Sequence, residues 1–329
     1  MVQLQDFNDH PASPRPWLIA GLVTVLLAGG IWWWRHEPAP VSRAPVKATA
    51  TPPAPVSVTP PVRGPQPAAV SASAPAASNP APAKASGAIP ASVLEEAAAM
   101  EKAGQLVEAR EKYLSILEQY PGAADLAAVE EKAGALGIEL VTKPNPMPEK
   151  ADYVVAGGDS LDKIARKFGC TKELLATNNL IVKAALIKKG DRYRVFSGTF
   201  KVRVNKTRND LLLTMNGRFF KRYRIGTGKF GKTPVGTFTV VERITQPVWW
   251  KPDGKAVPFG HPDNILGTHW LALKPVGNTP LVSGYGIHGT WDDSSIGKAE
   301  SAGCVRMHNA DVEQLYVLLP VGVDVVIEE

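Results

Sequence analysis

The stretch "KVRVNKTRNDLLLTMNGRFFKRYRIGTG" (residues 201–228) decides the fold, because two strand-like runs flank the two-residue turn Asn216-Gly217. Asn and Gly tolerate the positive φ that tight hairpin turns require, so the pattern is typical of a β-hairpin. "TPVGTFTVVERI", "HWLALKP" and "VDVVIEE" are three further strand-like segments. "NADVEQLYVLL" (residues 309–319) is the one clear helix, with Asn309 as its expected N-cap. We predict that residues 200–329 form a mostly β sandwich with one helix.

The composition of the whole chain indicates ordinary folded domains. Of 329 residues, 44% are hydrophobic and 21% are charged. The net charge is +6, but Lys and Arg are spread along the predicted strands rather than clustered with aromatic residues, so we expect no nucleic-acid partner. Two cysteines, Cys170 and Cys304, are too few and too far apart for a disulfide framework.

The first 90 residues do not have the composition of a packed domain. Residues 17–34, "WLIAGLVTVLLAGGIWWW", are uncharged, and as a helix they would span about 27 Å, close to the thickness of a bilayer core. The segment that follows, "RHEPAPVSRAP", is a poor signal-peptide cleavage site. We predict a cytoplasmic tail (residues 1–16), a single transmembrane anchor (17–34) and a disordered Pro/Ala-rich linker (35–90) that holds nearly half of the 29 prolines.

Residues 91–141 have the apolar spacing of helices, interrupted at Gly104 and at Pro121-Gly122. The order "AGQLVEAREKYLSILEQYP" resembles the second half of one tetratricopeptide unit, and such units normally need several copies to share a core. We therefore expect a small helical hairpin that acts as a spacer or docks on a protein partner, which the sequence does not identify.

Residues 150–197 predict a strand, two helices and a second strand. Ser160 and Thr171 are placed as helix N-caps, and Gly169 ends the first helix. "GDSLDKIARKF" and "NNL…IKKGDRYRV" resemble a LysM module, which implies binding to a glycan that contains N-acetylglucosamine, such as peptidoglycan. The resemblance places the glycan contacts at Gly158, Asp159, Ser160, Leu161, Asn179 and Leu180.

Cys304 lies in "ESAGCVRMH", where three roles are open for it. As a core residue it would need apolar neighbours on its own face, but Val305 and Met307 fall on the other face. As a zinc ligand it would need close partners. The histidines that might supply them show no close ligand spacing; they are His261, His269, His288 and His308.

The third role for Cys304, that of a nucleophile, agrees best with its neighbours. A thiol needs a base at neutral pH, and His288 at the end of the predicted strand "GYGIH" can supply one. The amides around Gly303 and Cys304 are placed to hold a developing oxyanion, and Arg306 to pair with a substrate carboxylate. No acid obviously completes a triad.

The motif "HGT…S-A-G-C-V-R-M" resembles the active-site signature of L,D-transpeptidases with a YkuD-type catalytic domain, over residues 200–329. The resemblance implies that Cys304 attacks the diaminopimelate–D-Ala bond of a peptidoglycan stem tetrapeptide and that His288 is the base. It also implies that the backbone carbonyl of Gly289 is the third member of the site, without metal or cofactor. Substrate-binding residues would be Arg306, Ser301 and Thr290.

Two questions about function stay open in the sequence. The acyl group can pass to an amine, which gives a 3-3 cross-link or attaches a lipoprotein lysine to the wall, or to water, which makes an L,D-carboxypeptidase. The chain can also be a non-catalytic wall-binding tether. Because the expected substrate is the cell wall, we expect a single-pass protein of the inner membrane with its catalytic domain in the periplasm.

Overall fold

The computed structural model describes residues 87–182 and 187–329, all of which fall in one compact unit, Ala76–Glu329. The expected cytoplasmic tail, the membrane anchor and nearly all of the linker lie outside the described residues. Within the described ranges, no helix combines the length and the apolar character that crossing a membrane requires.

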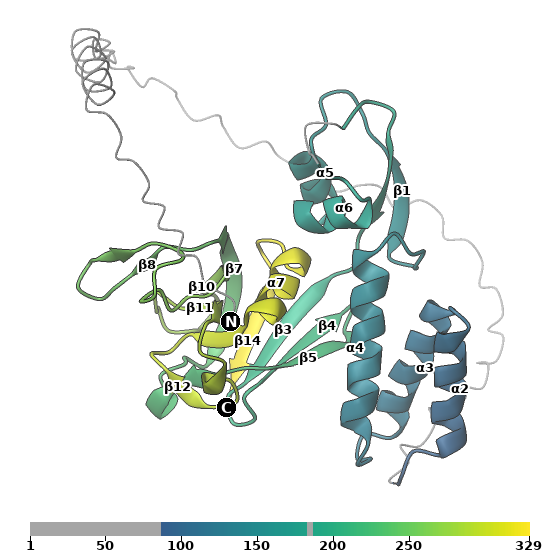
Figure 1. The fold of residues 1–329 in the computed structure, drawn as a ribbon, viewed down its shortest axis with the longest axis horizontal. Helices are drawn as coiled ribbons and strands as arrows, with labels where there is room; N and C mark the ends of the chain where they lie inside the picture. Colours follow the sequence, from purple (N-terminus) through teal and green to yellow (C-terminus); the bar gives the residue numbers. More distant parts are fainter. Residues whose placement is uncertain (1–86, 183–186) are drawn as a thin grey trace, which may run out of the picture. The chain divides into compact units, whose positions relative to one another are not determined.

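Residues 200–328 are built on one eight-stranded sheet with the strand order β13-β11-β10-β7-β14-β3-β4-β5 (Figure 1). Two pairs, β11–β13 and β14–β3, are parallel, and the other neighbours are antiparallel. The eight strands are β3 (Phe200–Asn205), β4 (Asp210–Met215), β5 (Arg218–Arg224), β7 (Gly236–Thr245), β10 (His269–Pro275), β11 (Gly286–Thr290), β13 (Val305–His308) and β14 (Asp324–Glu328).

Two small sheets and one α-helix complete this region. β6 (Thr227–Gly228) pairs with β12 (Ala299–Ser301), and β8 (Trp249–Trp250) pairs with β9 (Ala256–Val257). In residues 200–329, all of which are described, α7 (Asn309–Leu318) is the one α-helix, beside the short 3-10 turns η2 (Lys229–Gly231) and η3 (Asp293–Ser295). The mostly β fold with one helix is confirmed, with its strands gathered mainly in a single large sheet.

The turn and cap predictions in this region have different outcomes. Asn216 and Gly217 have φ of 51° and 81° between β4 and β5, so the predicted two-residue hairpin turn is confirmed. The expected N-cap at Asn309 is wrong by one residue, because α7 begins at Asn309 and His308 precedes it without a side-chain cap. The Asn309 side chain instead accepts the Thr268 N–H at 3.1 Å, a tertiary contact that helix propensity cannot predict.

The LysM region has the predicted order of a strand, two helices and a strand. β1 (Lys150–Val154) pairs antiparallel with β2 (Arg192–Phe196), and α5 (Leu161–Phe168) and α6 (Lys172–Asn178) lie between them in sequence. Ser160 accepts the Lys163 N–H, Thr171 accepts the Leu174 N–H, and Gly169 has φ 67°, so all three predicted helix-end signals are confirmed.

The segment expected to be a helical hairpin contains three helices, α2 (Ala91–Lys102), α3 (Leu106–Gln119) and α4 (Leu126–Thr142). α4 packs on β5, the edge strand of the large sheet (Figure 1). Gly137 has no side chain where the Phe220 ring approaches, and a Cβ there would lie 3.1 Å from that ring. Arg222 of β5 bonds both carboxylate oxygens of Glu130 at 2.8 Å. The apolar face of this segment is therefore covered, through α4, by the sheet edge of the same chain.

Candidate active site

The 301–304 loop connects β12 to β13 and ends at Cys304. Gly303 has φ 143°, and a Cβ at this position would lie 2.6 Å from Cε1 of Tyr285, so both backbone and space require glycine. The buried Ser301 hydroxyl accepts the Gly303 N–H at 3.0 Å and donates to the Cys304 carbonyl at 2.7 Å. The loop is thus held by its own hydrogen bonds.

Thr233 holds the same loop from a distant part of the sequence. Its hydroxyl is buried, accepts the Gly228 N–H at 2.8 Å and donates to the Gly303 carbonyl at 2.8 Å. Gly228 is the β6 partner of Ser301, so the two contacts fix β6 and the 301–304 loop together. Sequence reasoning missed Thr233, because a Thr-Pro pair before a strand has the composition of a turn.

The Cys304 side chain is partly exposed, and its Sγ lies 3.6 Å from the carbonyl oxygen of Gly284. Burial raises the pKa of the Cys304 thiol, whereas the Gly286 N–H and the Arg306 charge act in the opposite direction. The resting side chain is therefore a thiol, and it needs a base before it can attack a carbonyl.

His288 lies in β11 with 2% of its surface exposed. Burial lowers its pKa to about 4, and the nearby carbonyls of Gly289 and Leu266 only partly oppose this. The imidazole is thus neutral at pH 7 and able to accept a proton. Its Nδ1 lies 2.6 Å from the Gly289 carbonyl oxygen, so Nδ1 carries the proton and Nε2 is the basic nitrogen. The ring stacks on Trp270, with centroids 5.7 Å apart.

The sheet register places His288 and Arg306 on one face. In the parallel pair β11–β13, His288 is opposite Arg306 and Ile287 is opposite Val305. Ile287 and Val305 are buried in the core, and side chains alternate along a strand, so His288 and Arg306 share the other face. Cys304 lies two positions before Arg306, just outside β13, and the Arg306 charge and the Gly286 N–H of β11 both act on its thiol.

Arg306 supplies the positive charge of the site. Its backbone N–H and carbonyl both bond Gly226, at 2.8 Å each, which fixes the strand from its outer side. Its charge lowers the pKa of both His288 and Cys304. Its Nε is buried and has no hydrogen-bond partner among the described residues.

Gly289 and Thr290 follow His288 and are closely packed. A Cβ on Gly289 would lie 2.1 Å from Oδ1 of Asn309, so glycine is required there. The Thr290 hydroxyl is buried and accepts the Asp292 N–H at 3.1 Å. Thr290 and Ser301 were expected to bind substrate. Each hydroxyl bonds a neighbouring backbone group, but the Thr290 hydroxyl only accepts in that bond, so the contact of both residues with substrate stays a prediction.

Of the two backbone amides expected near the reacting carbonyl, one is already engaged. The Gly303 N–H bonds Ser301, whereas the Cys304 N–H makes no hydrogen bond with any described residue. Cys304 therefore offers the free backbone donor at this site.

The six LysM residues expected to bind glycan are only partly accessible. The Asp159 carboxylate accepts the Tyr153 hydroxyl and the Ala156 N–H, both at 2.8 Å, and Ser160 caps α5. Leu161 is buried, and the Asn179 side chain bonds the backbone of Arg194 from both its oxygen and its nitrogen. The positions that remain exposed are Gly158 and Leu180.

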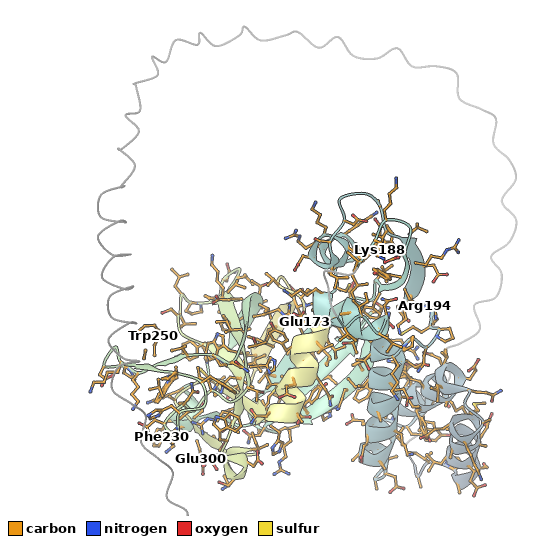
Figure 2. The ribbon with its side chains drawn as sticks, turned by 45° about the horizontal axis from the view of Figure 1, so that its top comes forward. Glu173, Lys188, Arg194, Phe230, Trp250 and Glu300 are labelled. Atoms are coloured by element: carbon orange, nitrogen blue, oxygen red, sulfur yellow. The ribbon has the colours of Figure 1, made fainter. Side chains whose placement is uncertain are left out.

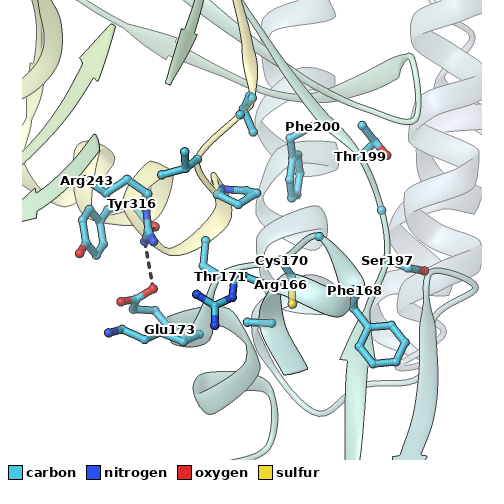
Figure 3. Close-up of a pocket in the computed structure, with 18 of the residues that line it drawn as sticks. Arg166, Phe168, Cys170, Thr171, Glu173, Ser197, Thr199, Phe200, Arg243 and Tyr316 are labelled. Atoms are coloured by element: carbon cyan, nitrogen blue, oxygen red, sulfur yellow. Dashed lines mark hydrogen bonds and ion pairs between the residues drawn. The ribbon is translucent and has the colours of Figure 1, made fainter. Parts of the chain in front are cut away.

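A cavity of about 860 Å³ lies on another part of the described unit (Figure 3). α5, α6, β7 and the segment between α7 and β14 line it, and Arg243 bonds Glu173 there at 3.0 Å. Cys170 is in its wall, whereas Cys304 is not. In the described ranges, no group of three or more side chains is placed to hold a metal ion, so the zinc role for Cys304 has no supporting cluster there.

Comparison with known proteins identifies the families that match this chain. The model for the YkuD "L,D-transpeptidase catalytic domain" matches residues 199–327, and the model for the "LysM domain" matches residues 153–192. The "Putative L,D-transpeptidase YkuD" of Bacillus subtilis (strain 168) is 34% identical over 184 residues, which are 53% of this chain and 97% of that protein.

Two other relatives share the catalytic region. The "Putative L,D-transpeptidase YqjB" of the same strain is 38% identical over 127 residues, 38% of this chain and 69% of that protein. The "Probable L,D-transpeptidase YbiS" of Escherichia coli (strain K12) is 35% identical over 113 residues, 30% of this chain and 34% of that protein.

The chain belongs to the YkuD family of L,D-transpeptidases. It is a peptidoglycan L,D-transpeptidase that carries a LysM module for the cell wall.

Proposed function

We propose that Cys304 is the nucleophile and His288 the general base of the acyl transfer. The observation that carries the proposal is the buried, neutral His288, whose Nδ1 is held by the Gly289 carbonyl on the sheet face that also carries Arg306, two positions after Cys304. His288 Nε2 removes the thiol proton as Sγ bonds the carbonyl carbon of the diaminopimelate–D-Ala linkage.

Charge that develops on the substrate oxygen meets the free N–H of Cys304. The Arg306 charge lowers the thiol pKa and pairs with a substrate carboxylate. The tetrahedral adduct then breaks its C–N bond. D-Ala leaves with the proton from the His288 imidazolium, and a thioester on Cys304 remains.

The thioester is resolved by the amine of a neighbouring stem peptide. His288 takes a proton from the amine while nitrogen bonds the acyl carbon, and the C–S bond breaks to restore the Cys304 thiol. The product is a 3-3 cross-link. Water or a lipoprotein lysine in place of this amine would give carboxypeptidase or wall-attachment activity through the same steps.

Product analysis tests the proposal. Purified enzyme is incubated with disaccharide-tetrapeptides, and the products are identified by mass spectrometry. We expect cross-linked dimers and free D-Ala from the unmodified enzyme and from Cys170→Ala, and neither product from Cys304→Ala. Tripeptide without dimers would refute cross-linking in favour of hydrolysis, and identical products from Cys304→Ala would refute its role as the nucleophile. No product from the unmodified protein would leave only a wall-binding role.

We also propose that the chain is anchored in the inner membrane by residues 17–34 and works in the periplasm. The uncharged segment with tryptophans at both ends, followed by a long Pro/Ala-rich linker, supports this arrangement, since the substrate lies outside the membrane. Membrane fractionation of the full chain and of a chain lacking residues 1–34 tests it. Equal recovery of both in the soluble fraction would refute it.

We propose that the LysM module holds the enzyme on the glycan through the loops at Gly158 and Leu180. The exposure of these two positions, beside four neighbours engaged in the fold, supports this narrower contact set. Co-sedimentation with purified peptidoglycan should weaken in Leu180→Asp and remain unchanged in Asp162→Asn, a substitution on the exposed face of α5. Equal binding of both variants would refute this contact.

A further inference from the structure

An aromatic side chain on the turn beside the active site is held out in solvent. The 229–232 turn (Lys229, Phe230, Gly231 and Lys232) contains η2, and all four residues are exposed. Phe230 is 94% exposed although its backbone has φ 54° and ψ 36°, the left-handed conformation that bulky side chains disfavour. The fold therefore keeps an apolar ring in water at a backbone conformation that asparagine or glycine would adopt more readily.

The residues before and after the 229–232 turn both bond the 301–304 loop. Before the turn, β6 pairs with β12, where Gly228 is opposite Ser301. After the turn, Thr233 donates its buried hydrogen bond to the Gly303 carbonyl. Figure 2 shows Phe230 and Glu300 of β12 on the same side of the catalytic region. The ring is thus presented at a fixed position beside the loop that ends in Cys304.

The charges of the turn identify what it would contact. Lys229 and Lys232 flank the ring, and neither makes an ion pair with a described residue, whereas Lys298 near β12 lies 4.0 Å from Glu300. Two exposed ammonium groups beside an exposed ring are complementary to a chain that has both carboxylates and short apolar side chains. Peptidoglycan stem peptides have this chemistry, and the neutral sugars of the glycan strand do not.

We propose that the 229–232 turn is a binding site for the anionic stem peptide of peptidoglycan. Lys229 and Lys232 pair with its carboxylates, and Phe230 covers its alanyl methyl groups. The proposal rests on acyl transfer at Cys304. The turn acts on binding of the natural peptide and leaves the reactivity of the Cys304 thiol unchanged. The reason is that the turn contacts the 301–304 loop through Gly228 and Thr233 and not through its exposed side chains.

Kinetics with two kinds of substrate test the turn. The variants are Lys229→Gln/Lys232→Gln and Phe230→Asn, since Asn accepts the left-handed backbone. Lys201→Gln on β3 and Val321→Asn after α7 are matched controls, both exposed. Each protein is assayed for KM with a soluble tetrapeptide that lacks sugar and for acylation of Cys304 by a small carbapenem.

We expect KM for the tetrapeptide to rise by about fivefold in each turn variant, and the rise in the lysine variant to shrink with added salt. Acylation by the carbapenem stays within about twofold of the unmodified enzyme, and both controls leave KM unchanged.

Three outcomes would overturn the proposal. They are an unchanged KM, a rise in KM only when the substrate carries its disaccharide (which would assign the turn to glycan), and a loss of carbapenem acylation in the turn variants (which would assign it to support of the loop). If the unmodified enzyme is not acylated at all, acyl transfer at Cys304 fails together with this inference.

Discussion

The two cysteines of the chain have thiols whose pKa is raised by burial, yet their surroundings differ. Cys170 follows α5, is 5% exposed, and burial raises its pKa to about 11. Cys304 is partly exposed, and the Arg306 charge and the Gly286 N–H oppose the effect of burial on its pKa. The Cys304 thiol is thus accessible and lies within the influence of the Arg306 charge, whereas the Cys170 thiol is buried, so we expect Cys304 to be the reactive cysteine.

The largest expected effect comes from replacing a cysteine with alanine, which we compare at the two positions. Cys304→Ala should lower the rate of D-Ala release by at least about 10⁴-fold, because no other described group at the site can form the thioester. Cys170→Ala should keep the rate within about twofold of the unmodified enzyme. Intact-protein mass spectrometry after carbapenem treatment should show one adduct that disappears only in Cys304→Ala. An adduct on Cys170 would contradict the expected difference in reactivity between the two cysteines.

His288→Gln should have the next largest effect, a loss of about 10²- to 10⁴-fold in the rate of acylation of Cys304. Glutamine retains a hydrogen bond to the Gly289 carbonyl but cannot accept the thiol proton. Stopped-flow measurement of carbapenem acylation gives the rate, and His261→Gln, at an exposed loop position, is the control. A loss below tenfold would mean that another group deprotonates Cys304.

Acid should destabilise the enzyme through the same histidine. The pKa of His288 is about 4 when folded and about 6.5 when unfolded, so the unfolded chain binds more protons between these values. The free energy of unfolding should fall by about 3 kcal/mol as pH drops from 6.5 to 4, and should be free of this penalty above pH 6.5. Urea titrations should show a flatter pH dependence in His288→Gln, and an unchanged slope would contradict the assignment.

The smallest expected effect concerns Thr233, which supports only one of the two cysteines. Thr233→Val keeps the shape but removes the bonds to Gly228 and Gly303, so acylation of Cys304 should slow by about tenfold. Thr233→Ser should restore most of the rate. If the valine variant loses thermal stability but acylates at the normal rate, Thr233 supports the fold and does not position the nucleophile.

Local signals in the sequence predicted local structure well. Ser160, Thr171 and Gly169 mark helix ends, and Asn216-Gly217 marks a hairpin, because in each case the residue bonds or frees its own neighbouring backbone. The contact between His288 and the next carbonyl was instead expected from the YkuD resemblance.

Contacts between distant segments were not predictable in this way. Thr233 meets Gly303 only because β6 pairs with β12, and Asn309 leaves its expected cap to bond Thr268. Both depend on the order of strands in the sheet, which hydrophobic periodicity does not specify. The Ser301 and Thr290 hydroxyls bond backbone groups of their own loops, which the motif did not predict, and their expected contact with substrate stays a prediction.

The packing of α4 on β5 has a consequence for how this enzyme is handled in the laboratory. The family match begins at residue 199, but Phe220 is fully buried, and α4 covers its ring where Gly137 removes a side chain. Arg110 of α3 also donates to the Phe219 carbonyl on the edge strand. A fragment cut at the family boundary would expose an aromatic, hydrogen-bonding sheet edge, a template for self-association. A well-behaved expression fragment should therefore include α3 and α4.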